Sequence, residues 1–239
     1  MKYEILEQLY EGKAKRVYKT NNSEVFYIEY KDDATAFNAL KKGTIENKGI
    51  VNNLMSNKMF QILEKAGIRT HLIENVDDRH TFVKAVEIVQ VEVIVRNIAT
   101  GSLTKRLGIK DGTILEPTIL EFCLKSDALG DPIINEYHVK AMKLATDNEI
   151  LQIKDMTFKI NDILKAQMDK LDLTLVDFKI EFGRYRGNII LADEISPDTC
   201  RLWDKKTNER MDKDRFRLDL GNEKATYQEV MRRVNTLTV

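Results

Sequence analysis

The sequence predicts an α+β fold, with an antiparallel sheet lobe first and a larger lobe of mixed helices and strands after it. Three observations predict it: strand-like segments fill the first third, residues 137–172 are periodic enough for two helices, and a hairpin pattern follows them. Strands and helices in separate blocks are typical of α+β folds rather than alternating parallel ones. With 239 residues, 43% of them hydrophobic, the chain can bury a substantial core. We place the two lobes at residues 1–87 and 88–239.

The first third contains the predicted sheet lobe. Residues 17–19 and 24–30 are rich in aromatic and β-branched side chains, and the polar residues 21–23 form a turn between them. A helix is expected over residues 48–66, because apolar side chains recur there at near-helical spacing, and Gly67 is a suitable C-terminal cap.

The remaining elements follow from the same patterns. Residues 81–95 are rich in valine and isoleucine, which predicts one or two strands. Residues 173–182 and 188–195 flank the turn-rich segment 183–187, which predicts a hairpin. A final helix is expected over residues 225–233.

Composition narrows the classes of function and location. Lysine plus arginine and aspartate plus glutamate both total 38, so no net field draws the molecule to nucleic acid or to an anionic membrane. Cys123 and Cys200 lie far apart without metal-ligand spacing, which fits reduced cytosolic thiols. Residues 1–10 are charged, and no stretch reaches about 18 apolar residues. We therefore expect a cytoplasmic protein with no membrane segment.

The most informative segment is residues 175–183, where side chains alternate across a predicted strand. Asp177, Lys179 and Glu181 then share one face, and apolar side chains fill the other. Packing alone does not require a row of carboxylate, ammonium and carboxylate above an apolar floor. A solvated strand face with an internally paired lysine is the alternative.

The next strand carries an acidic residue inside an apolar run. Asp193 lies within residues 189–195, where an uncompensated charge is costly, so it needs a partner. If the two strands pair, Glu181 and Asp193 approach on one face and can hold Mg²⁺ carrying nucleotide phosphates. Lys179 would then neutralise transferred phosphate. Because no histidine or cysteine contributes, zinc and copper are disfavoured.

A basic segment near the N-terminus is a candidate phosphate-binding loop. Residues 10–18 place Gly12 and three cations before a strand. A backbone that turns at Gly12 exposes amides, and Lys13 or Lys15 can reach oxyanions. The segment matches neither common glycine-rich nucleotide motif, so a solvated basic hairpin is the alternative.

A second candidate for anion binding follows the predicted strand at residues 91–95, which is apolar except for Glu92. Arg96 projects where this strand ends, and Ser102, with the amide after Gly101, can add donors for a carboxylate or a phosphate. A strand-end salt bridge is the alternative. Arg201 lies close in sequence to the proposed metal hairpin, which suggests a role in binding substrate phosphate.

Other polar features point to no chemistry. The charged runs 204–206 and 211–215 alternate in sign, which is typical of solvated surface. His71, His80 and His138 show no metal-ligand spacing, and no serine, histidine and acid form a recognisable local motif. Nucleophilic hydrolysis is therefore unsupported.

Taken together, the segments resemble the SAICAR synthetase family across nearly the entire chain. The apolar strand with arginine and a Gly-Ser ending lies at 92–102, and the Asp-x-Lys-x-Glu-x-Gly signature lies at 177–183. Further family-like segments are 10–18, 127–132, 196–198 and 201–204. Gln90 departs from the pattern, because the family commonly has proline there, which affects local strand shape more than chemistry.

The resemblance implies a sheet lobe folded over ATP, distantly like a kinase small lobe, with the nucleotide in the cleft between the lobes. The resemblance further implies that the phosphates are covered by Gly12, Lys13, Ala14, Lys15 and Val17, and that adenine is bordered by Lys84, Val86 and Glu87. Mg²⁺ would be held by Glu181 and Asp193. Carboxyaminoimidazole ribotide would be contacted by Arg96, Ser102, Asp177, Lys179 and Arg201, and the residues implied to act in catalysis are Lys179, Asp177, Arg96 and Lys13.

The implied reaction joins the carboxylate of this ribotide to the amine of L-aspartate, while ATP becomes ADP and phosphate. The resemblance also implies a homodimer. Two other functions stay open on the residues alone. A phosphotransferase would stop at a phosphorylated small molecule, although the protein-kinase catalytic loop is absent from the sequence. A nucleotide- or RNA-binding module would use the basic clusters at 13–16 and 105–106, against the zero net charge.

Overall fold

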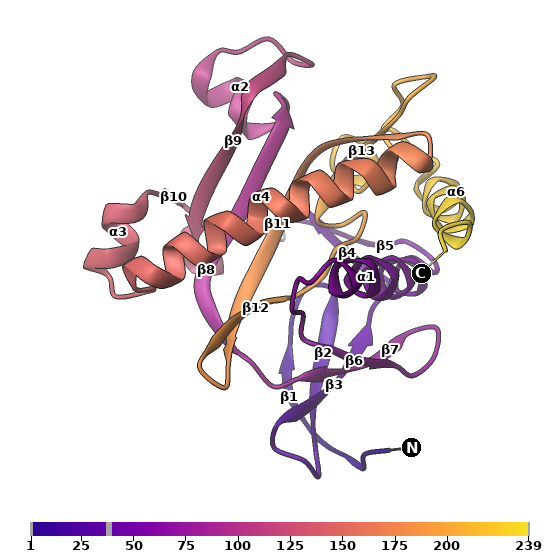
Figure 1. Cartoon of the computed structure of the whole chain (residues 1–239). Coiled ribbons are helices and arrows are strands. Elements are labelled where there is room, and N and C mark those ends of the chain that lie inside the picture. The colour runs from indigo at the N-terminus through magenta and orange to yellow at the C-terminus, as the bar shows by residue number, and fades with distance from the viewer. Residues whose placement is uncertain (1, 37–39, 239) are drawn as a thin grey trace.

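The N-terminal sheet is antiparallel and five-stranded, with strand order β1-β2-β3-β7-β6, in a computed structural model that describes residues 2–36 and 40–238 (Figure 1). Its strands are β1 (Ile5–Glu11), β2 (Lys15–Thr20), β3 (Val25–Tyr30), β6 (Leu72–Asn75) and β7 (His80–Lys84). Aromatic side chains pack on this sheet, with Tyr27 stacked on His80 at a ring-centroid distance of 5.0 Å. The predicted sheet lobe is confirmed.

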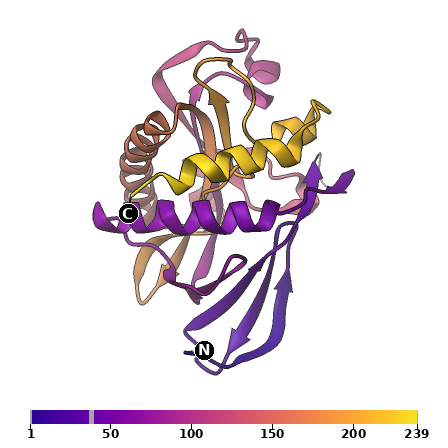
Figure 2. The ribbon, with the colours of Figure 1, turned by 90° about the vertical axis from the view of Figure 1, so that its right-hand side faces the viewer.

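Helix α1 (Lys48–Lys65) ends as its sequence predicts. Ala66 is its C-cap, and Gly67 follows with φ of 86°, a left-handed conformation that glycine adopts without strain. The buried face carries Met55, Met59 and Leu63. This face packs against helix α6 (Glu223–Asn235), and the two helices run side by side in Figure 2. Between β3 and α1 the chain forms a small hairpin of β4 (Asp33–Ala36) and β5 (Lys41–Thr44).

The second sheet is also antiparallel and has six strands, in the order β10-β9-β8-β11-β12, with β13 pairing to β11. Its strands are β8 (Glu87–Ile98), β9 (Ile114–Leu124), β10 (Ile133–Ile134), β11 (Leu173–Tyr185), β12 (Asn188–Ala192) and β13 (Cys200–Asp204). The β11–β12 hairpin is confirmed with a tighter turn than predicted. Arg186 and Gly187 both have positive φ, 49° and 75°, which gives a two-residue turn that matches strand twist.

Helix α4 (Asp147–Lys170) lies across one face of the second sheet (Figure 1). It begins at a capping box in which Thr146 accepts the amide of Glu149 and the Glu149 carboxylate accepts the amide of Thr146. Together with α3 (Glu136–Ala141) it confirms the two helices expected over 137–172. Short helices α2 (Ser102–Leu107), η1 (Asp127–Leu129) and α5 (Asp214–Arg217) lie in the connections.

The main hydrophobic core joins both parts of the chain. It contains Met55 and Leu63 of α1 together with Phe178 and Ile180 of β11 and Val230 of α6. The division at residues 87 and 88 stays a prediction; there the chain passes from the first sheet to the second. Within the described residues no helix is long and apolar enough to span a membrane.

Candidate functional site

A cavity of about 450 Å³ lies between the two sheets. One wall is apolar and consists of side chains from β2, β3 and β7, from the connection into β8 and from the start of β8 (Val17, Phe26, Ile28, Val83, Val86 and Ile88). The opposite wall carries most of the charge and includes Lys179, Glu181 and Asp193. A cavity with one apolar wall and one charged wall suits a heterocycle that carries phosphate.

The loop between β1 and β2 closes one side of the cavity. Gly12, Lys13, Ala14 and Lys15 all line it, as Val17 does. The Gly12 amide donates to the Lys15 carbonyl at 2.8 Å, so the loop is a tight turn. A Cβ on Gly12 would lie 3.1 Å from the ring of Tyr10, so the glycine lets this ring lie close against the loop.

The two lysines of this loop have different surroundings. Lys13 is partly exposed and contacts Asp127 at 2.7 Å. Lys15 reaches the opposite sheet, where its ammonium contacts Asp193 and lies 3.1 Å from Glu194. Burial opposes the charge on Lys15, but these two carboxylates raise its pKa well above the usual value. Lys15 therefore joins the two walls as a full positive charge.

Lys179 is the centre of the charged wall. Its ammonium lies 3.1 Å from Glu92, 2.6 Å from Glu181 and 3.2 Å from Asp193. Lys125 adds a second cation 2.9 Å from Glu181. Burial opposes the charge on Lys179, yet the surrounding carboxylates raise its pKa well above the usual value. The expected pairing of β11 with β12 is present, and it brings Glu181 and Asp193 to one ammonium.

The carboxylates of Glu181 and Asp193 are chemically suited to Mg²⁺, which prefers oxygen ligands. Burial opposes ionisation of Asp193, but Lys15 and Lys179 hold its pKa well below the usual range, so it is an anion. No group of three or more acidic, histidine or cysteine side chains is arranged as a metal site among the residues described. Two carboxylates leave most of the six positions of an octahedral ion to phosphate and water, as is usual for magnesium bound with a nucleotide.

A second cluster lies at the other end of the row on β11. Arg96 contacts Asp177 at 3.2 Å and Ser102 at 3.2 Å. Arg201 contacts the same Asp177 oxygen at 2.8 Å. A Cβ on Gly101 would lie 2.8 Å from the Arg201 guanidinium, so this glycine allows the loop to approach the arginine. The strand-end salt bridges weighed above are present and hold two guanidinium groups in one place.

The structure brings the predicted site residues together in two groups. The residues predicted to bind nucleotide and metal line the cavity, with one exception. The second cluster lies outside the set of cavity-lining residues, and it consists of Arg96, Ser102, Asp177 and Arg201. Lys84 and Val86 line the cavity, and the Lys84 ammonium donates to the Thr70 carbonyl at 2.7 Å. Glu87 is not among the lining residues; its side chain is 75% exposed and lies 2.9 Å from Arg184. The roles assigned to these residues stay predictions.

His71 was not singled out by its sequence pattern, yet it lines the cavity and is buried. Its ring meets Phe60 edge-on at a centroid distance of 5.2 Å. Burial, reinforced by Lys15, lowers the pKa of His71 to about 3, so the imidazole is neutral. A single histidine outside any motif gives no indication, from one sequence alone, that it lines a cavity.

The charged run 211–215 corrects an expectation, because Asp212, Lys213 and Asp214 are buried rather than solvated. The Asp212 carboxylate accepts the amides of Leu202 at 2.8 Å and Asp214 at 2.7 Å. Asp214 in turn pairs with an arginine of β13. The prediction of exposure was wrong because the partners that compensate these buried charges come from distant parts of the chain, which the local charge pattern does not show.

In the run 204–206 the lysines are exposed as predicted, whereas Asp204 is buried. Its carboxylate accepts the amides of Lys206 and Thr207, both at 2.9 Å, and pairs with Arg233.

Comparison with known proteins identifies this combination of cavity, basic loop and charged row. The family model of SAICAR synthetase matches residues 8–234. The chain belongs to the SAICAR synthetase family. A phosphoribosylaminoimidazole-succinocarboxamide synthase of Caldanaerobacter subterraneus is 57% identical over 228 residues, which cover 95% of this chain and 97% of that protein.

Solved structures of the family share the whole fold. The synthase from Ehrlichia chaffeensis superposes with a TM-score of 0.94 at 43% identity, covering 98% of this chain and all of that one. A SAICAR synthetase in complex with ADP has a TM-score of 0.92 at 42% identity, with 99% of each chain covered. The family, the α+β fold and the ligase class expected from the sequence are confirmed.

Proposed function

We propose that this chain joins 5-amino-1-(5-phosphoribosyl)imidazole-4-carboxylate to L-aspartate, with ATP converted to ADP and phosphate, as a ligase of purine biosynthesis. The observation that carries the proposal is the row Asp177, Lys179 and Glu181 on β11. It links the two-arginine cluster at one end to the charged wall of the nucleotide cavity at the other. We further propose that the enzyme works in the cytoplasm as a homodimer.

The nucleotide fits the cavity with its base against the apolar wall and its phosphates under the loop 12–15. Lys13 and Lys15 supply cations there, and the backbone amides of a tight turn add donors. Glu181 and Asp193 would hold Mg²⁺, which when bound neutralises charge on the phosphates. Lys15 and Lys179 now contact these carboxylates. Exchange of carboxylate for phosphate partners would keep the buried charges balanced.

The ribotide fits the opposite end of the row. Arg96, Arg201 and Ser102 gather several donors within one small region, where Asp177 now accepts from both guanidinium groups. A phosphate or a planar carboxylate would replace part of these contacts. Asp177 holds both guanidinium groups and so fixes their orientation. With the ribotide phosphate anchored at this end, its ring carboxylate can point along β11 towards Lys179.

The ribotide carboxylate must first be activated, because its oxygen is a poor leaving group when an amine attacks the carbon. A carboxylate oxygen attacks the γ-phosphorus, forming an O–P bond while the bond to ADP breaks. The aspartate amine then attacks the acyl carbon, a C–N bond forms, and phosphate leaves with the C–O electron pair as the amine loses a proton. Lys179, whose ammonium contacts Glu181 and Asp193, would stabilise the charge of the transferred phosphoryl group.

An omission experiment tests the proposed reaction. ADP release is measured with Mg²⁺, ATP, the ribotide and L-aspartate, leaving out one component at a time. We expect sustained release only when all four are present, because the acyl phosphate does not turn over without an amine. Release without aspartate would indicate a phosphotransferase, and no release with all four would favour a binding module.

A further inference from the structure

A group of buried charges lies beside the cavity and has no role in the steps above. It is formed by Lys48 at the start of α1, Asp198 before β13, Lys213 before α5, and Tyr227 of α6. The side chains of Lys48, Asp198 and Lys213 are 0%, 4% and 10% exposed. These residues are far apart in the sequence, and the fold brings them together at one place.

The group carries more positive than negative charge. One oxygen of Asp198 accepts the Lys48 ammonium at 2.8 Å and the Lys213 ammonium at 3.3 Å. The other oxygen accepts the Tyr227 hydroxyl at 2.7 Å. One carboxylate therefore serves two ammonium groups, and Lys213 has the longer contact.

The pKa of Lys213 reflects this shortage of negative charge. Burial lowers it, and repulsion from Lys48 and Arg217 lowers it further, against the attraction of Asp198. A second anion close to Lys213 would remove the imbalance, because a buried charge is stable only when it is compensated.

The excess positive charge lies at the cavity in which the reaction is proposed to occur. Lys213, Asp198 and Thr199 line the same cavity as Lys179. The backbone amide of Lys179 donates to the carbonyl of Thr199, the neighbour of Asp198, at 2.8 Å, so the segment that carries Asp198 is bonded to β11 at Lys179.

The other cations that line the cavity have assigned partners. Lys13 and Lys15 belong to the phosphate loop, and Lys125 and Lys179 contact Glu181. The Lys84 ammonium donates to the Thr70 carbonyl. The arginine cluster serves the ribotide at the far end of the row. The remaining substrate, L-aspartate, brings two carboxylates and needs a cation close to the activated carbon.

We propose that Lys213 binds a carboxylate of L-aspartate, with Lys48 neutralising Asp198 behind it. This inference rests on the proposed ligase function. The lysine would hold the amino acid beside Lys179, so that its amine faces the acyl group formed there. Charge-assisted contacts of this kind are strong when water is excluded.

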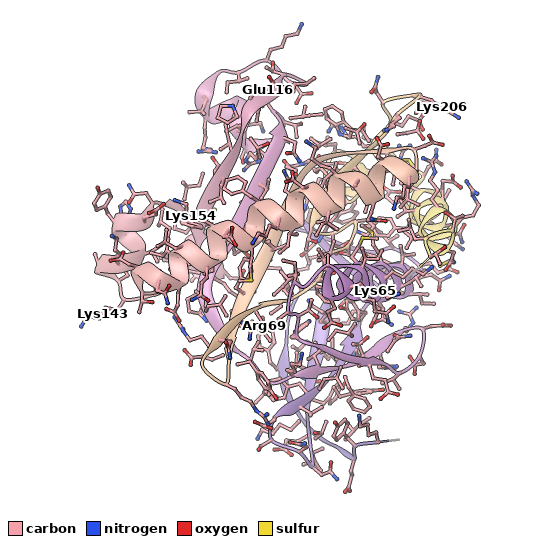
Figure 3. All side chains as sticks on the ribbon, viewed as in Figure 1. Lys65, Arg69, Glu116, Lys143, Lys154 and Lys206 are labelled. Atoms are coloured by element: carbon pink, nitrogen blue, oxygen red, sulfur yellow. The ribbon has the colours of Figure 1, made fainter. Side chains whose placement is uncertain are left out.

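The test is the variant Lys213→Gln, with Lys206→Gln as the matched control. Lys206 is exposed on the turn after β13 and lies at the outer surface in Figure 3. Loss of the contact should raise the KM for L-aspartate roughly tenfold to hundredfold. The KM values for ATP and the ribotide should stay within about twofold, as they should in the control. Lys213→Met is the second variant should the glutamine disturb folding.

Hydroxylamine separates this role from phosphoryl transfer, because it is a nucleophile without a carboxylate. It attacks the same acyl phosphate, forming a C–N bond and releasing phosphate. In Lys213→Gln we expect hydroxylamine-dependent ADP release to stay within about twofold of the wild type. An equal fall with both nucleophiles would overturn the inference by assigning Lys213 to the phosphoryl group. An unchanged KM for aspartate would also overturn it. A wild-type enzyme that formed no aspartate product would overturn the proposed function itself.

Discussion

Lys179 contacts three carboxylates, from Glu92, Glu181 and Asp193, through a single ammonium group. Such an arrangement holds the charge of the lysine in the absence of ligand and keeps its position fixed. When phosphate enters, the ammonium can exchange a carboxylate partner for a phosphate oxygen without moving far. We therefore expect Lys179 to act by exchanging a carboxylate partner for a phosphate oxygen.

Replacement of Lys179 by glutamine should lower kcat by about two to three orders of magnitude, as the loss of one well-placed transition-state donor does. Steady-state ADP release measures the effect. Lys159→Gln is the control, because Lys159 makes an exposed surface pair with Asp155 and should behave as the wild type does. A fall of less than about threefold in Lys179→Gln would contradict the assigned role.

His71 gives a prediction about acid stability. Its pKa is lowered from 6.5 to about 3 in the folded chain. Between these values the unfolded chain takes up a proton that the folded chain does not, so stability is lost as pH falls below about 6.5. His71→Gln should reduce the slope of unfolding free energy against pH by up to about 1.4 kcal/mol per pH unit.

Urea unfolding between about pH 4.5 and 6.5, within the window set by the two pKa values, measures this slope. His138→Gln is the control, since His138 is exposed at the third position of α3 and glutamine is also suited to its capping role. Equal slopes in His71→Gln and the wild type would show that the His71 imidazole protonates freely in the folded protein.

At the scale of elements, β11 was the part of the site that the sequence predicted best. Its alternation showed directly that Asp177, Lys179 and Glu181 share one face, because a strand has a period of two. The run 211–215 was predicted wrongly, because its burial depends on distant partners such as Leu202 and Arg201. Local pattern therefore predicted the row but not the buried charges beside it.

The start of α1 offers a test of packing between elements. A Cβ on Gly49 would lie 2.4 Å from the Tyr30 carbonyl oxygen, which is backbone and cannot move aside easily. Alanine normally stabilises a helix by about 1 kcal/mol relative to glycine. Here Gly49→Ala should instead destabilise the protein by about 1–3 kcal/mol in urea unfolding.

Lys65→Ala, at the exposed end of the same helix, is the control and should change stability by less than about 0.5 kcal/mol. A stabilised Gly49→Ala variant would show that α1 and β3 are not packed as closely as the structure has them.

At the scale of the whole molecule, the cavity lies between two sheets, so a bound nucleotide contacts both. The fold and the family were predictable from motifs spread along the chain, and both are confirmed. His71 and Lys213 were not predictable as cavity residues, because their place depends on how the two sheets meet.

Binding across the two sheets should stabilise the protein against heat. ADP with Mg²⁺ at about a hundred times Kd should add about 2.7 kcal/mol and raise Tm by about 5–10 °C. Without Mg²⁺ the increase should be smaller, and Glu181→Gln should abolish that difference. Glu87→Gln, whose parent side chain lies outside the cavity, should retain it. A Glu181→Gln variant with the full magnesium effect would remove this residue from the metal site.

If β11 directs the ribotide carboxylate to the γ-phosphate, the carboxylate oxygens have a defined fate that can be measured. Ribotide labelled with heavy oxygen in its carboxylate is turned over with ATP and L-aspartate, and the released phosphate is analysed by mass spectrometry. We expect one labelled oxygen in each phosphate, because the carboxylate oxygen leaves on phosphorus. Unlabelled phosphate formed together with the aspartate product would contradict it.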